Sequence, residues 1–83
     1  MNLKELYEMQ VKTSINGEEW TIRIEPAAHP REYAIIFNLV DPTGEPKHFT
    51  LLDKEIFKVR DKETVMTEII EPTLNRLKAR VTH

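Results

Sequence analysis

The dipeptide Asn16-Gly17 constrains this chain most, because it predicts a β-hairpin together with its register. Both central residues of a two-residue type I′ turn need positive φ, and Asn-Gly is the preferred pair for them. The strand pairs that follow from this turn are Ile15 with Glu18, Thr13 with Trp20, Val11 with Ile22, and Met9 with Ile24. Side chains alternate along strands, so these pairs collect the apolar residues on one face. Turn chemistry and hydrophobic pattern therefore predict the same register.

A second hairpin is predicted around residues 41–44, whose sequence Asp-Pro-Thr-Gly is typical of a type I turn followed by a glycine with positive φ. The flanking strands would cover residues 32–40 and 47–52. A three-residue loop gives apolar pairs across these strands, Phe37 with Phe49 and Ile35 with Leu51. Both faces of residues 32–40 are largely apolar, which favours a central strand.

Residues 61–81 have the periodicity of one long amphipathic helix, with Asp61 as its N-cap. The predicted apolar stripe consists of Met66, Ile69, Ile70, Leu74, Leu77 and Val81. Pro72 interrupts the helix and leaves the Glu68 carbonyl without an intrahelical donor. Both residues lie on the polar side, and the stripe keeps its phase across them. A single kinked helix is therefore favoured over two separate helices.

Two shorter segments complete the predicted fold. Asn2 is a suitable N-cap for a short helix over residues 3–9. Residues 53–60 fit a short edge strand or an irregular connection better than a helical turn. The sequence thus predicts a single α+β domain over residues 1–83. It has a short N-terminal helix and an antiparallel sheet of four or five strands from two hairpins, covered by a long C-terminal helix kinked at Pro72.

The composition argues against catalysis and against a resident cofactor or metal. There is no cysteine, and both glycines are used by the predicted turns, which leaves none for a phosphate-binding loop. Ser14 is the only serine, and no histidine lies near it in the sequence. The three histidines, His29, His48 and His83, show no metal-ligand spacing. We therefore expect a protein that is not an enzyme and that binds no cofactor or metal.

Charge and hydropathy limit which cellular compartment and which kinds of partner we expect. The N-terminal residues carry charges where a signal peptide would be apolar, and no run approaches the roughly 20 apolar residues of a membrane span. The expectation is a cytoplasmic protein without a membrane partner. The net charge of −2, from 12 basic and 14 acidic residues, lacks the basic excess of proteins that wrap nucleic acid. A nucleic-acid partner would need a local basic patch.

A small core with free strand edges favours a non-catalytic binding or accessory protein that acts through protein–protein contact or self-association. Small phage or mobile-element accessory proteins and inhibitors share this profile. The alternative is a nucleic-acid-binding module, whose basic patch would consist of Lys12, Arg23 and Arg31 on the sheet or of Arg76, Lys78 and Arg80 on the helix. An enzyme subunit or ligand carrier is a third, weaker hypothesis. The candidate partner-binding residues are Arg23, Arg31, Glu71, Asn75, Arg76, Lys78 and Arg80.

Trp20 has two interpretations. Beside Ile22 on the apolar face, it is predicted to pack under the C-terminal helix. With that helix on the other face, Trp20 would instead be an exposed contact residue of the kind found at binding hot spots. The prolines in the loops fit either a rigid recognition surface or ordinary turns. They are Pro26, Pro30, Pro42 and Pro46.

Overall fold

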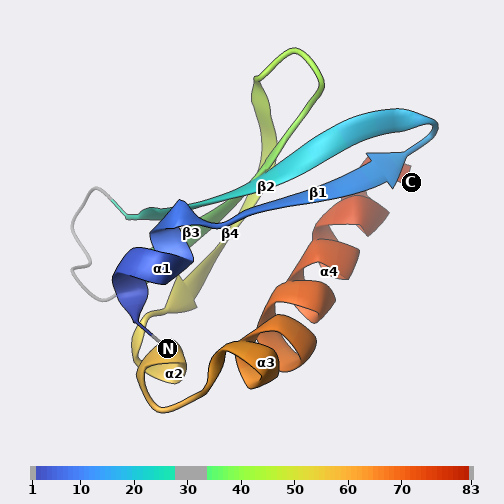
Figure 1. Ribbon diagram of the computed structural model, residues 1–83. Helices are drawn as coiled ribbons and strands as arrows, with labels where there is room; N and C mark the ends of the chain where they lie inside the picture. Colours follow the sequence, from blue (N-terminus) through green and yellow to red (C-terminus); the bar gives the residue numbers. More distant parts are fainter. Residues whose placement is uncertain (1, 28–33, 83) are drawn as a thin grey trace.

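The computed structural model describes residues 2–27 and 34–82, which form an antiparallel sheet with a layer of helices on one face (Figure 1). The strands are β1 Gln10–Ile15, β2 Glu18–Pro26, β3 Ala34–Val40 and β4 Pro46–Asp53, in this order across the sheet. The helical elements are α1 Leu3–Glu8, α2 Glu55–Lys58, α3 Lys62–Thr64, the π-helical segment η1 Val65–Ile70, and α4 Glu71–Thr82. The predicted α+β fold is confirmed, with four strands in the described part of the chain.

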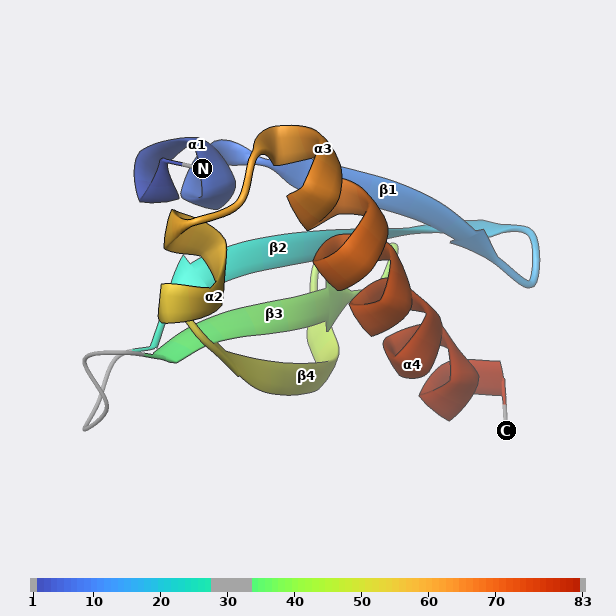
Figure 2. The same cartoon turned by 90° about the horizontal axis from the view of Figure 1, so that it is seen from below.

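The core lies between the sheet and the helical layer. Figure 2 views the molecule from the helical side, where α2, α3 and α4 lie in front of the strands. The N-terminal helix α1 is capped as predicted, since Asn2 Oδ1 accepts from the N–H of Lys4 at 2.8 Å, and it adds Leu6 to the core. The buried core side chains are Leu6, Ile15, Ile22, Ile24, Ile35, Phe37, Leu39, Phe57, Val65, Ile69, Ile70 and Leu77.

The β1–β2 hairpin has the predicted turn and register. Asn16 and Gly17 have φ values of 52° and 81°, as a type I′ turn requires. The ladder pairs Ile15 with Glu18, Thr13 with Trp20, and Val11 with Ile22. The fourth predicted pair is not part of the ladder, which begins at Gln10 with Arg23. Met9 is instead the C-cap of α1, so β1 begins one residue later, at Gln10.

Trp20 packs against the core on the helical face, in agreement with the first of its two interpretations. It is half-buried, and its strand neighbour on the same face, Ile22, is fully buried. The indole Nε1 is buried without a hydrogen-bond partner among the described residues. Trp20 therefore contributes to the packing of the two layers rather than to an outer contact surface.

The β3–β4 hairpin has the predicted turn. The carbonyl oxygen of Asp41 accepts from the N–H of Gly44 at 3.0 Å, and Gly44 has a φ of 90°. Beyond the turn the ladder is irregular. Its first two pairs are Val40 with Pro46 and Leu39 with His48. Lys47 is thus an extra residue in β4, a β-bulge that shifts all later pairs by one.

The bulge overturns the predicted register of this second hairpin. The predicted pairs were Phe37 with Phe49 and Ile35 with Leu51. The observed pairs are Phe37 with Thr50, Ile35 with Leu52, Asn38 with Phe49, and Ile36 with Leu51. A shift of one residue moves every side chain of a strand to the other face of the sheet. Phe49 and Leu51 therefore lie on the face opposite the helices instead of in the core.

Residues 53–60 contain the helical turn α2, so the favoured prediction of an edge strand or irregular connection is wrong. Asp53 Oδ1 accepts from the N–H of Glu55 at 2.9 Å, and the carbonyl of Lys54 accepts from the N–H of Phe57 at 3.1 Å. The turn directs Phe57 into the core, where its ring stacks on Phe37 with the centroids 6.1 Å apart. The reason is tertiary, because this turn places the Phe57 ring in the core against Phe37 of β3.

The C-terminal helix is one continuous run of residues 62–82. Asp61 is its N-cap as predicted, since Asp61 Oδ1 accepts from the N–H of Thr64 at 2.8 Å. Glu68 and Pro72 are both exposed, so the proline lies on the solvent side as the sequence indicated. The loss of a donor for the Glu68 carbonyl therefore costs little, because water can reach this exposed residue.

The distortion near Pro72 takes the form of the π-helical segment η1. The N–H of Glu71 bonds to the carbonyl of Met66, five residues earlier, in place of the usual spacing of four. This wider spacing brings Val65 and Ile70 onto one face, and both are fully buried. Val65 was not part of the predicted stripe, because a regular α-helix would turn it away from Ile70.

Candidate functional site

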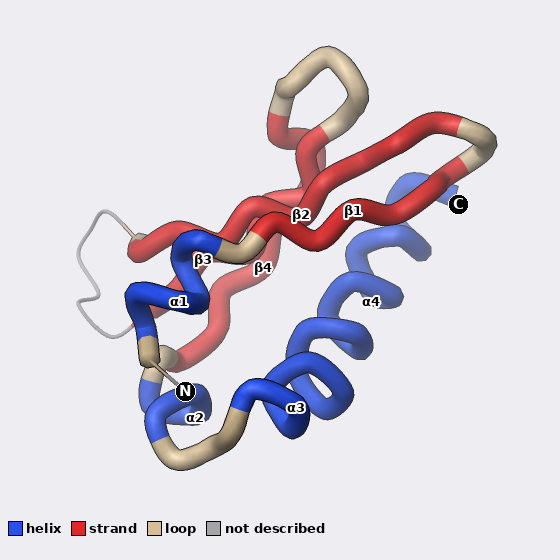
Figure 3. The backbone as a smooth tube through the Cα atoms, in the orientation of Figure 1, coloured by secondary structure: helices blue, strands red, loops and turns tan. Residues whose placement is uncertain are grey.

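The sheet face opposite the helices has a polar half and an apolar half. On β1 and β2, it carries Gln10, Lys12, Ser14, Glu19, Thr21, Arg23 and Glu25. On β3 and β4, three apolar side chains with solvent exposure lie together: Ile36, Phe49 and Leu51, which we call the apolar strip. Phe49 is 58% exposed and Leu51 is 47% exposed. Figure 3 shows the β3–β4 loop projecting from this same side of the sheet, away from the helices.

The apolar strip borders a free edge of the sheet, because β4 pairs only with β3 among the described strands. The carbonyl oxygen of Phe49 accepts a hydrogen bond from Arg80 Nη1 at 2.9 Å, so this carbonyl points away from β3. Within a strand, the N–H and C=O of one residue point to the same edge, and successive residues alternate. Phe49, Leu51 and Asp53 therefore direct their backbone groups outward.

The combination of exposed apolar side chains and outward backbone groups distinguishes β4 from the rest of the surface. Val59 is the other large exposed apolar residue among those described, at 84%, and it lies in the connection between α2 and α3. A single exposed apolar side chain of this kind is common on protein surfaces. Phe49 and Leu51 instead lie two residues apart on one edge strand, next to Ile36.

The polar half of the open face is internally charge-paired. Lys12 Nζ lies 3.5 Å from a carboxylate oxygen of Glu19, and Arg23 Nε donates to Glu25 at 2.8 Å. These are two of the three residues proposed from the sequence as a basic patch on the sheet. The third, Arg31, lies outside the described residues. An acidic neighbour beside each cation reduces the attraction of this surface for phosphate.

The remaining residues predicted from the sequence lie on α4. Glu71, Asn75, Arg76 and Arg80 are exposed and Lys78 is half-buried. Arg76 Nη2 donates to the hydroxyl of Thr73 at 3.5 Å, whereas Arg80 reaches across to β4. The helical layer and Arg23 lie on opposite sides of the sheet, so the predicted residues do not form one surface. Of this set, the structure brings Arg80 to the apolar strip.

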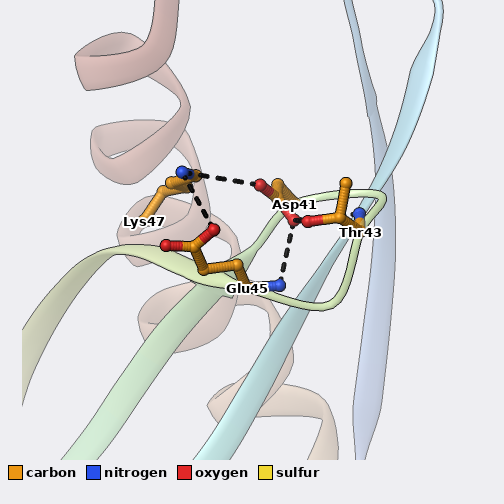
Figure 4. A network of polar contacts seen from close by, with 4 residues as sticks. All are labelled: Asp41, Thr43, Glu45 and Lys47. Carbon is orange, nitrogen blue, oxygen red and sulfur yellow. Dashed lines mark hydrogen bonds and ion pairs between the residues drawn. The ribbon is translucent and has the colours of Figure 1, made fainter.

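A polar network orders the β3–β4 turn beside the strip (Figure 4). Asp41 Oδ1 accepts from the N–H of Thr43 at 2.9 Å, from its hydroxyl at 2.6 Å and from the N–H of Glu45 at 3.0 Å. Lys47 Nζ lies 3.8 Å from Asp41 Oδ2 and 3.3 Å from Glu45 Oε2. The Thr43 hydroxyl, followed by the N–H of Glu45, lowers the pKa of Asp41 below its ordinary value. The bulge residue Lys47 is therefore tied into the turn.

The described residues hold neither a metal-binding cluster nor a membrane-spanning helix. Across residues 2–27 and 34–82, no three His, Asp or Glu side chains are grouped so that they could hold a metal ion. His48 is half-buried in β4, and the other two histidines lie outside these ranges. No helix within the same ranges is both long enough and apolar enough to cross a membrane.

Phe49 and Leu51 are the residues of this surface that sequence reasoning placed wrongly. Pairing apolar residues with apolar residues put both of them in the core, and only the bulge at Lys47 reverses this. The one local signal is Pro46, because a proline at the start of a strand is typical of an edge strand or a bulge. That signal indicates an irregular strand but not which face its side chains take.

Comparison with known proteins identifies no matching family, no matching curated protein and no matching solved structure. Function is therefore inferred from the β4 surface itself.

Proposed function

We propose that this chain is a small non-catalytic binding protein that contacts a protein partner through the β4 edge and the apolar strip. The observation that carries the proposal is the coincidence of two exposed apolar side chains, Phe49 and Leu51, with outward backbone groups on one edge strand. Proteins usually protect such an edge, because it pairs readily with another strand. Strand addition to an open edge is a recurrent mode of protein recognition, in which the backbone provides affinity and the side chains provide specificity.

The energetics also favour a covered strip. Full burial of a Leu or Phe side chain stabilises a protein by about 1.5–3 kcal/mol relative to exposure. A domain of this size has only about 3–5 kcal/mol of net stability from its core. Phe49 and Leu51 are each about half exposed, so covering both would contribute roughly half of that energy per side chain, a sizeable fraction of the stability of the fold.

Nucleic-acid binding is the second hypothesis and has less support. Lys12 and Arg23 each have an acidic partner, and Arg80 donates to a backbone carbonyl. Phosphate binding would have to compete with these interactions. We further propose an accessory or inhibitory role in the cytoplasm, the compartment that a cysteine-free sequence suits.

Site-specific photo-cross-linking tests the proposed function. A photoreactive amino acid replaces Leu51, and the control carries it at Val59, which is apolar and more exposed but lies in the connection between α2 and α3 instead of in β4. After irradiation in cells of the source organism, we expect a covalent protein adduct from position 51 and not from position 59. An adduct with nucleic acid would favour the second hypothesis. The absence of any protein adduct at position 51 would contradict the proposal.

A further inference from the structure

We infer that the partner of the β4 edge is a second copy of this chain, paired antiparallel through β4 so that one sheet continues across both copies. This inference rests on the proposed function, since it names the partner for the same surface. It is drawn from the order of residues along β4, which is self-complementary in charge and in hydrophobicity. A two-fold axis would place Thr50 of one copy opposite Thr50 of the other.

The backbone restricts the register to a few choices. Phe49, Leu51 and Asp53 direct their backbone groups outward, so in an antiparallel ladder between copies each must face another outward residue. The two-fold axis can then pass through Phe49, Thr50 or Leu51. Each of these centres sets different side chains opposite one another on the open face.

Side-chain chemistry selects the centre at Thr50. This register places Phe49 opposite Leu51 twice and Lys47 opposite Asp53 twice. A centre at Phe49 would put Lys47 opposite Leu51, and a centre at Leu51 would put Phe49 opposite Asp53. Directly opposed apolar pairs and oppositely charged pairs stabilise antiparallel strands, whereas mismatched pairs do not. The residue order of β4 therefore favours one register for pairing with a second copy.

The groups that this register needs are accessible. The Lys47 side chain is 43% exposed; its ion pair with Glu45 is exposed and its contact with Asp41 is long, at 3.8 Å, so the Lys47 side chain can rearrange. Asp53 uses Oδ1 to accept from the N–H of Glu55, and its other carboxylate oxygen can meet a cation. An interface this short belongs to the small class that buries less than about 1,200 Å², so we expect a reversible dimer.

Arg80 covers the edge in the single chain. Its Nη1 donates to the carbonyl oxygen of Phe49, the acceptor that the N–H of Leu51 in the second copy would use. Charged side chains placed at a strand edge are a common protection against pairing. We therefore expect the Arg80→Ala variant to dimerise more tightly than the wild type. Stacking of two open faces without edge pairing would not respond in this way.

A charge-swap experiment tests the register on the full chain by sedimentation equilibrium from micromolar to millimolar concentration. In the Lys47→Glu dimer both charge pairs become acid opposite acid, and in the Asp53→Lys dimer both become base opposite base. Each variant alone should dimerise about tenfold more weakly than the wild type. An equimolar mixture should recover dimers, because both pairs across the mixed dimer are again opposite in charge. Circular dichroism of each variant confirms that it is folded.

The outcomes separate this inference from the proposed function. A wild-type chain that stays monomeric at millimolar concentration overturns self-pairing, and so does a mixture that recovers no dimer. If position 51 still cross-links to a different protein, the proposed function stands and only the identity of the partner is wrong. If position 51 gives an adduct of twice the chain mass and the mixture recovers dimers, both are supported.

Discussion

The two hairpins of this sheet begin with equally clear turn sequences and end with opposite distributions of apolar side chains. In β1–β2, the turn at Asn16-Gly17 leads into a regular ladder, and the apolar residues face the helices. In β3–β4, the turn leads into a bulge at Lys47, and Phe49 and Leu51 face away from them. A turn thus determines register only as far as the ladder remains regular. The hairpin that departs from the expected pattern is also the one that carries the candidate binding surface.

The largest expected effect is a difference in stability loss between apolar residues truncated in the two hairpins. Ile22→Ala, which truncates a fully buried side chain in β2, should lower the free energy of unfolding by about 2–5 kcal/mol. Leu51→Ala in β4 should change it by at most about 0.5 kcal/mol in dilute protein, because the side chain is already half in solvent. Urea denaturation of both variants measures the difference. Equal losses would show that Leu51 belongs to the core and would remove the basis of the comparison.

An intermediate effect concerns the glycines of the two turns. Gly17 and Gly44 have φ values of 81° and 90°, and a Cβ added to either would meet no atom within 4 Å. Alanine at either position should therefore cost about 1–2 kcal/mol from backbone strain alone. Thermal unfolding of Gly17→Ala and Gly44→Ala would measure these costs, with Ser14→Ala on the exposed strand face as the control. A cost near zero in either variant would mean that its turn relaxes to another conformation.

The smallest expected effect is a pH dependence of the second hairpin. The pKa of Asp41 is lowered from its ordinary value of 3.8 by hydrogen bonds from Thr43 and Glu45. The ionised carboxylate therefore adds stability that is fully present above pH 3.8 and is lost as the pH falls through the lowered folded-state pKa. Asp41→Asn should flatten the decline of stability in this acidic window.

Asp61 provides the matched comparison for that pH experiment, because its pKa is lowered by hydrogen bonds from Thr64 at the start of the C-terminal helix. Asp61→Asn should also flatten the decline of stability at acidic pH, but without changing the β3–β4 turn. Proton NMR of the Thr43 and Glu45 amides across the titration distinguishes the two sites. If the free energy of unfolding falls equally with pH in wild type and Asp41→Asn, the turn network does not contribute to stability.

Much of the fold followed from local patterns in the chain. The α+β layout, the caps at Asn2 and Asp61 and the first hairpin were all predicted correctly. The candidate surface was not, because its position depends on the face to which β4 turns its side chains. The sequence drew attention to charged residues such as Arg23 and Arg80, of which only Arg80 lies at the strip, as a cover for the edge.

The sequence by itself determined the features that a few neighbouring residues can establish through φ preferences and short-range hydrogen bonds, such as the turn at Asn16-Gly17 and the cap at Asp61. Tertiary structure decided the bulge at Lys47, the helical turn that buries Phe57, and the π-helical spacing that buries Val65. The last two involve side chains that meet in the core between the two layers, and the bulge sets which face of β4 meets that core. Local sequence patterns cannot report them, because the same residues satisfy their local preferences in either register and gain their packing energy only where the second layer covers them.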